Sequence, residues 1–183
     1  MIIDEGVIIQ NPEWISVGDN VWIDKYCVLI AGKPDEQKSA KVFSIKKNSS
    51  YHSERGELII KNNVHIAPFC TIQAHGGVYI GNNVGIASGS RVYSLSHHYK
   101  NPSILGDQHA YKFTPMVDST EQSLISAPVV IDTDCAIGLN CVVLPGTTVQ
   151  KGTWIGVSSY ISGDIKGNAI YVSQQAHFLK DKW

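Results

Sequence analysis

The chain has 183 residues, enough for one domain with a substantial core. Its 15 Lys and Arg nearly balance its 16 Asp and Glu, and neither charge forms a block, which argues against nucleic acid as an obligate partner. The N-terminal MIIDEGVII lacks the positive region and cleavage site of a secretory signal, and no stretch approaches the roughly 20 apolar residues of a membrane helix. We therefore expect a cytoplasmic protein with a single domain over residues 1–183.

A branched aliphatic residue recurs at every sixth position in runs along the chain, and a small or branched residue follows four places later. A period of six fits neither a helix nor a simple strand. It is typical of a parallel β-helix, in which three hexapeptides form one triangular coil and coils stack as a solenoid. The runs are Ile3 and Ile9; Val17, Ile23 and Leu29; Ile60, Ile66 and Ile72; Ile80, Ile86 and Val92; and Ile131, Ile137, Val143, Val149, Ile155 and Ile161.

Interruptions of the period predict where chain segments leave the prism. Two interruptions are short, and two are long insertions at about 31–58 and 93–128. Each follows the third hexapeptide of a group of three, so all should emerge from one corner. Loops on a rigid scaffold carry function, and we expect the site at this corner. After Ile161 the period fades, and a short helix at about 174–180 is expected to cap the stack.

The four cysteines each stand four residues after a repeat aliphatic. Their spacing matches neither zinc ligands nor a disulfide framework. We expect buried packing thiols.

The segment APVVIDTDCAIGLNCVVLPGTTVQKGTWIGVSSYISGDI resembles the C-terminal coils of hexapeptide-repeat acyltransferases. Pro128, Gly138, Asn140 and the Leu-Pro-Gly at 144–146 fall in register with that family's pattern. The resemblance covers nearly the whole chain and is strongest to sugar O-acetyltransferases. It implies a left-handed β-helix, a homotrimer, and acetyl-CoA as a co-substrate, with no permanently bound cofactor or metal.

In those O-acetyltransferases a histidine follows the coil that precedes the P-V-x-I-G segment, at the root of a loop. His97, in RVYSLSHHYKNP, aligns with that histidine, whereas His98 lies one residue beyond the aligned position. Imidazole suits a general base because its ordinary pKa lies near neutrality. The resemblance therefore implies His97 as the base of a direct transfer within a ternary complex, with His98 as the fallback.

Residues that bind the acceptor and the donor follow from the same register. His75, at the same corner, either binds the acceptor or only fills a turn beside two glycines. His98 and Tyr99, in an aromatic-rich insertion, are further candidates for acceptor contact. The family lays the pantetheine arm of the donor along a prism edge, with the phosphates toward the C-terminus. The implied donor-binding residues are Ala136, Gly138, Gly156, Ser158 and Lys180.

The sequence departs from the family pattern in two places: Ala136 replaces the family's Trp, and the segment 67–69 replaces the Asn-aromatic-Asn of galactoside and maltose transferases. The second departure argues against a simple-sugar acceptor like theirs, and the long, aromatic-rich insertion at 93–128 suggests a larger one. We therefore favour O-acetylation of a sugar or surface-polysaccharide precursor. N-acetylation of a nucleotide-linked amino sugar is the alternative. A zinc carbonic anhydrase of the γ type, with His65, His75 and His97 as ligands, is a third hypothesis.

Overall fold

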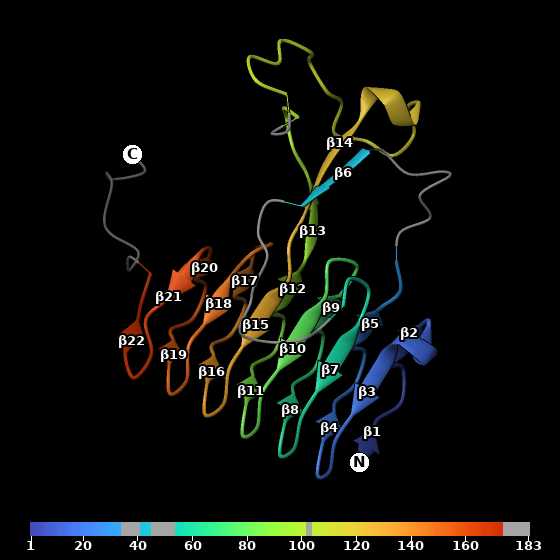
Figure 1. Ribbon diagram of the computed structural model, residues 1–183. Helices are drawn as coiled ribbons and strands as arrows, with labels where there is room; N and C mark the ends of the chain where they lie inside the picture. The colour runs from blue at the N-terminus through green and yellow to red at the C-terminus, as the bar shows by residue number, and fades with distance from the viewer. Residues whose placement is uncertain (34–40, 45–53, 102–103, 174–183) are drawn as a thin grey trace, which may run out of the picture.

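The computed structural model describes residues 1–33, 41–44, 54–101 and 104–173; within 41–44, only the backbone is described. The chain winds into a three-sided stack of coils, and an arm stands off one corner (Figure 1). The predicted C-terminal helix at about 174–180 lies outside the described residues, as does Lys180. Among the described helices, none has the length and apolar character needed to cross a membrane.

Each side of the prism is a parallel sheet of short strands. Sheet A contains β1 (Ile2–Ile3), β4 (Trp22–Ile23), β8 (His65–Ile66), β11 (Gly85–Ile86), β16 (Ala136–Ile137), β19 (Trp154–Ile155) and β22 (Ile170–Tyr171). Sheet B contains β2 (Ile8–Gln10), β5 (Val28–Ile30), β9 (Thr71–Gln73), β12 (Arg91–Tyr93), β17 (Val142–Val143) and β20 (Tyr160–Ile161). Sheet C contains β3 (Ile15–Val17), β7 (Leu58–Ile60), β10 (Val78–Ile80), β15 (Val129–Ile131), β18 (Thr148–Val149) and β21 (Asp164–Ile165).

The chain visits sheets A, B and C in turn, and one such round is a coil. Coils 1 to 6 begin at β1, β4, β8, β11, β16 and β19. Repeat aliphatics face each other from coil to coil: Ile66 pairs with Ile23 on one side and Ile86 on the other. From the second coil onward these side chains are buried in the prism, where they form its core. The predicted register is confirmed.

In coils 2 to 5, the small residue four places after the sheet A aliphatic also forms a hydrogen bond. It donates a thiol or hydroxyl hydrogen to a backbone carbonyl of the next coil, at the corner between sheets A and B. The pairs are Cys27 Sγ to Ala67 O (3.1 Å), Cys70 Sγ to Ala87 O (3.2 Å), Ser90 Oγ to Gly138 O (2.7 Å) and Cys141 Sγ to Gly156 O (3.1 Å). All four cysteines are free and buried, as predicted. The position thus selects a side chain that is both small and a donor.

Every interruption of the period lies at the corner between sheets B and C, and this prediction is also confirmed. The short ones follow β2 and β9, and the first of them contains the 3-10 helix η1 (Pro12–Trp14). The long ones follow β5 and β12. The first and second long insertions therefore leave from coils 2 and 4 on the same edge.

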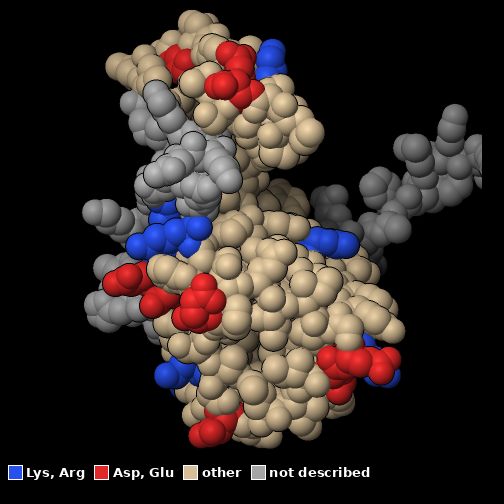
Figure 2. Space-filling view, turned by 90° about the vertical axis from the view of Figure 1, so that its right-hand side faces the viewer, with Lys and Arg blue, Asp and Glu red and all other residues tan. Residues whose placement is uncertain are grey.

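Described segments of both long insertions form strands, where the sequence predicted only loops. They join in a small mixed sheet of β6 (Lys41–Ser44), β13 (Leu95–His97) and β14 (Ser123–Ser126). The 3-10 helix η2 (Ser119–Glu121) precedes β14 in the arm. Strand β14 runs antiparallel to β13 and parallel to β6. This sheet is the stem of the arm, which projects away from the prism body (Figures 1 and 2).

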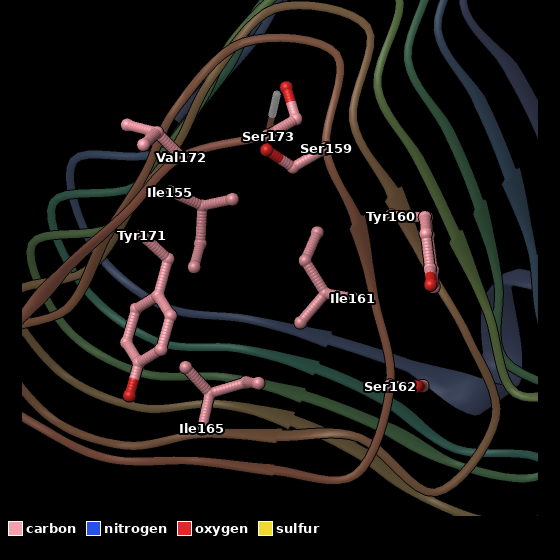
Figure 3. Close-up of a pocket in the computed structure, with 9 residues that line it drawn as sticks. All are labelled: Ile155, Ser159, Tyr160, Ile161, Ser162, Ile165, Tyr171, Val172 and Ser173. Atoms are coloured by element: carbon pink, nitrogen blue, oxygen red, sulfur yellow. The ribbon is translucent and has the colours of Figure 1, made fainter. Parts of the chain in front are cut away.

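A cavity of about 570 Å³ lies at the C-terminal end of the stack. Ile155, Ile161 and Ile165 point into it, with Tyr171 beside them (Figure 3). These are core positions of the last coil, so the cavity lies at the end of the hydrophobic core that no described residue covers.

Candidate active site

The root of the arm is clamped to the prism by Ser94. Its hydroxyl accepts the N–H of Gly76 (2.8 Å) and donates to Gln73 O (2.8 Å). Its carbonyl accepts the N–H of Ala127 (3.0 Å), where the chain returns to the prism. The Gln73 side chain accepts the N–H of Leu95 (3.1 Å). Because the outgoing end of the arm is tied to coil 3 and the returning end to Ser94, the first residues of β13 have a fixed position.

His97 is the last residue of β13 and pairs with Leu124 of β14. Its ring lies 4.9 Å from the ring of Phe113, between centroids. The Nδ1 atom is buried and has no hydrogen-bond partner among the described residues. Buried polar atoms are nearly always paired, so this nitrogen requires a partner beyond the residues that the structure describes. A ligand or a second chain can provide it.

The other two histidines of the predicted acceptor region have partners within the chain. His98 Nδ1 lies 2.7 Å from Lys100 O, and its ring packs against that of Tyr99 at 4.7 Å. His75 Nδ1 lies 2.8 Å from Gly32 O, which ties the bulge of coil 3 to the start of the first insertion. That contact gives His75 a structural task, and an acceptor contact would have to come from its Nε2.

The predicted donor-binding residues form a line along the corner between sheets A and B. Ala136 and Gly138 line a groove of about 420 Å³ on the face of sheet A. Gly156 and Ser158 follow one coil further. At Gly138 an added Cβ would lie 2.7 Å from Ile155 O, so close stacking of coils 5 and 6 requires glycine there.

Backbone N–H groups at this corner that lack a partner among the described residues belong to neighbours of the implied donor-binding residues. The N–H groups of Gly138 and Gly156 already donate to the next coil, to Ile155 O (2.9 Å) and Tyr171 O (2.7 Å). By contrast, within the described chain no partner is found for the N–H of Ser88, Leu139 or Val157. Each of these follows a sheet A aliphatic by two residues, so the hexad phase contained this signal.

One wall of the groove is an aromatic stack on sheet A. His65 stacks on Trp22 with ring centroids 4.7 Å apart, and its Nε2 lies 3.6 Å from Asp24 Oδ2. The Lys25 N–H, more than His65, lowers the pKa of Asp24 below its ordinary value. Trp22 Nε1 in turn donates to Asp4 Oδ2 (3.0 Å). These contacts fix the imidazole of His65 at one side of the groove.

The three proposed zinc ligands do not come together in one chain. His65 lies on sheet A, His75 at the corner between sheets B and C, and His97 on the arm. Among the residues that the structure describes, no group of three or more His, Cys, Asp or Glu is placed to hold a metal.

Comparisons with known proteins bear on this arrangement. No family model matches the chain. It is 26% identical over 168 residues to dTDP-4-amino-4,6-dideoxy-D-glucose acyltransferase of Escherichia coli, covering 92% of this chain and 72% of that protein. It is 28% identical over 127 residues to the E. coli protein named lipopolysaccharide biosynthesis O-acetyl transferase WbbJ, covering 69% of this chain and 61% of WbbJ.

Among solved structures, the fold is that of AntD, an N-acyltransferase from Bacillus cereus. The complex of AntD with dTDP and 3-hydroxybutyryl-CoA matches with a TM-score of 0.67 and 21% identity, over 93% of this chain and 74% of that one. A complex of an AntD variant with dTDP-4-amino-4,6-dideoxyglucose and coenzyme A gives 0.66 and 22%, over 97% and 78%.

The resemblance to sugar acyltransferases is confirmed. The all-β, left-handed parallel β-helix is confirmed as the fold class, and so is the prediction of an acyltransferase. The prediction of a CoA-type co-substrate is also confirmed, because the structural neighbours contain coenzyme A or an acyl-CoA.

Proposed function

We propose that this protein transfers an acetyl or other short acyl group from acyl-CoA directly to a hydroxyl of a sugar, with His97 as the general base. The observation that carries the proposal is the buried, unpartnered Nδ1 of an imidazole held at the root of the arm. The WbbJ relative supports a hydroxyl acceptor on a sugar of a surface-polysaccharide precursor. Because acyl-CoA is a cytoplasmic metabolite, we place the reaction in the cytoplasm.

A complete site requires more than one chain. His97 emerges at the corner between sheets B and C, whereas the donor groove lies on sheet A beside the corner between sheets A and B. The whole width of sheet B separates the two corners. We therefore propose a homotrimer with its axis along the stack, in which the base of one chain faces the groove of the next.

The proposed reaction needs no enzyme nucleophile. The imidazole of His97 takes the proton of the acceptor hydroxyl as its oxygen attacks the thioester carbonyl. A backbone N–H of the donor corner, such as that of Ser88 or Leu139, stabilises the oxyanion. The C–S bond then breaks, and the CoA thiolate receives the proton from the imidazolium.

A second acceptor class has its own support. The relative that covers 92% of the chain acts on a dTDP-linked 4-amino sugar by name, and AntD was captured with such a sugar. In that reaction an amine attacks the thioester, and a neutral amine depends less on a base than a hydroxyl does.

The test compares His97→Ala with His98→Ala as a matched control. Free thiol release from acetyl-CoA is measured with hydroxyl and amino acceptors, together with oligomeric state and melting temperature. Loss of a general base predicts a fall in kcat of about 10²–10⁴-fold for His97→Ala with the hydroxyl acceptor, and only a few-fold fall for His98→Ala. A fall of a few-fold in His97→Ala would rule out the base role.

A further inference from the structure

The outward row of side chains on sheet A contains a gap. Going from coil 2 to coil 6, the row reads Trp22, His65, Gly85, Ala136 and Trp154. Large rings thus stand on both sides of two consecutive positions that have almost no side chain. The rows of a sheet are 4.7–4.9 Å apart, so His65 and Trp154 are separated by roughly 14 Å. The groove of about 420 Å³ occupies this gap.

Packing does not explain the glycine on the floor of the groove. A Cβ added at Gly85 would meet nothing within 4 Å, in contrast to Gly138, where it would collide with backbone. Gly85 also does not adopt the left-handed backbone that favours glycine. Glycine within a strand weakens it and often marks close approach of a ligand. The free space above Gly85 therefore points to an occupant.

The groove has an apolar character with polar groups only at its margin. Its floor and sides comprise Gly85, Ala136, Leu139 and the indole of Trp154, and His65 and Ser88 are polar members of the lining. Trp154 and Leu139 are exposed, so no other described part of the chain covers them. Such a lining fits an aliphatic chain better than a charged group.

The groove lies at the level of the proposed base. Gly85 belongs to β11, and the arm that bears His97 leaves from β12 of the same coil, coil 4. A rotation axis along the stack brings each coil against its own copy at the same height. In the trimer proposed above, Gly85 of one chain therefore has the same height as His97 of a neighbour, where the thioester reacts.

We propose that this gap is an acyl pocket, in which Gly85 and Ala136 admit a chain longer than acetyl. The inference rests on the proposed function and specifies its donor: a short aliphatic acyl-CoA of about four carbons. Each buried methylene favours binding by about fourfold, so butyryl-CoA should exceed acetyl-CoA in kcat/KM by up to about 15-fold.

The experiment measures kcat/KM for acetyl-, propionyl- and butyryl-CoA in the wild type and in a graded series, Gly85→Ala, Gly85→Val and Gly85→Leu. Ala136→Leu fills the pocket from the adjacent coil and serves as an independent variant. Size-exclusion chromatography and melting temperature check assembly and fold. We expect the butyryl-to-acetyl ratio to fall stepwise along the series, by at least tenfold in Gly85→Val.

Three results would overturn the inference. The first is a wild type that turns over acetyl-CoA alone, with a selectivity that does not change in the variants. The second is a Gly85→Val variant in which only the KM of the acceptor rises, which would assign the groove to the acceptor. The third is loss of the oligomer in Gly85→Val and Ala136→Leu, which would make the groove a contact between chains. Absence of turnover with every acyl-CoA would overturn the proposed function together with the pocket.

Discussion

Gly76→Ala tests how the arm is joined to the prism. A Cβ on Gly76 would overlap the carbonyl oxygen of Ser94 and lie 2.8 Å from Ser126 Oγ. That carbonyl accepts the N–H of Ala127 at 3.0 Å, so it cannot move away without loss of this bond. Overpacking costs about 1–3 kcal/mol, and a lost hydrogen bond adds about 0.5–1.5 kcal/mol. We expect destabilisation of about 2–4 kcal/mol.

The assay is thermal unfolding, with Gly85→Ala as the matched substitution. For a chain of this size 1 kcal/mol corresponds to about 2–4 °C, so Gly76→Ala should melt about 4–16 °C lower. In Gly85→Ala the new methyl group meets open space, and a smaller unfolded-state entropy should raise stability by about 0.4–1 kcal/mol. If Gly76→Ala melts within 2 °C of the wild type, the clamp described for Ser94 is wrong.

Three further predictions concern buried and charged groups. Thr153→Val removes a buried hydroxyl that donates to Gln150 O at 2.5 Å. The free energy of unfolding, measured in urea, should fall by about 1–2 kcal/mol, and an unchanged midpoint would contradict this. The N–H of Asn101 contributes most to lowering the pKa of Asp107 below its ordinary value. The resulting stabilisation of the arm is present above that ordinary value and is lost as pH falls through the folded pKa. The protection factors of amides in the arm should therefore fall at low pH in the wild type but much less in Asp107→Asn. Burial raises the pKa of Cys135, and all four thiols are enclosed, so a thiol reagent at pH 8 should react with none before unfolding; rapid labelling of the native protein would refute this.

Much of the candidate site was predictable because the hexad phase assigns an inward or outward direction to each residue. The phase placed His97 beside the insertion corner, and it placed Ala136 and Gly138 along another edge. The phase also identifies the residues of the groove. The residues that directly precede the sheet A aliphatics Ile66, Ile86, Ile137 and Ile155 point outward and line the groove: His65, Gly85, Ala136 and Trp154.

The arm was beyond such reasoning. Its stem pairs residues 41–44 with 123–126, and strands of four residues carry almost no period of their own. Likewise, the unpartnered Nδ1 of His97 depends on how the insertion folds back, which no local pattern encodes.

The sequence by itself determined the prism, its register and the corner from which the insertions leave, because each of these follows from a local alternation of apolar, small and turn-forming residues. The tertiary structure alone decided that the two insertions unite in one stem, that Ser94 clamps its root, and that a groove opens on sheet A. Those features arise from contacts between residues far apart in the chain, whose free energy depends on spatial proximity rather than on any repeat.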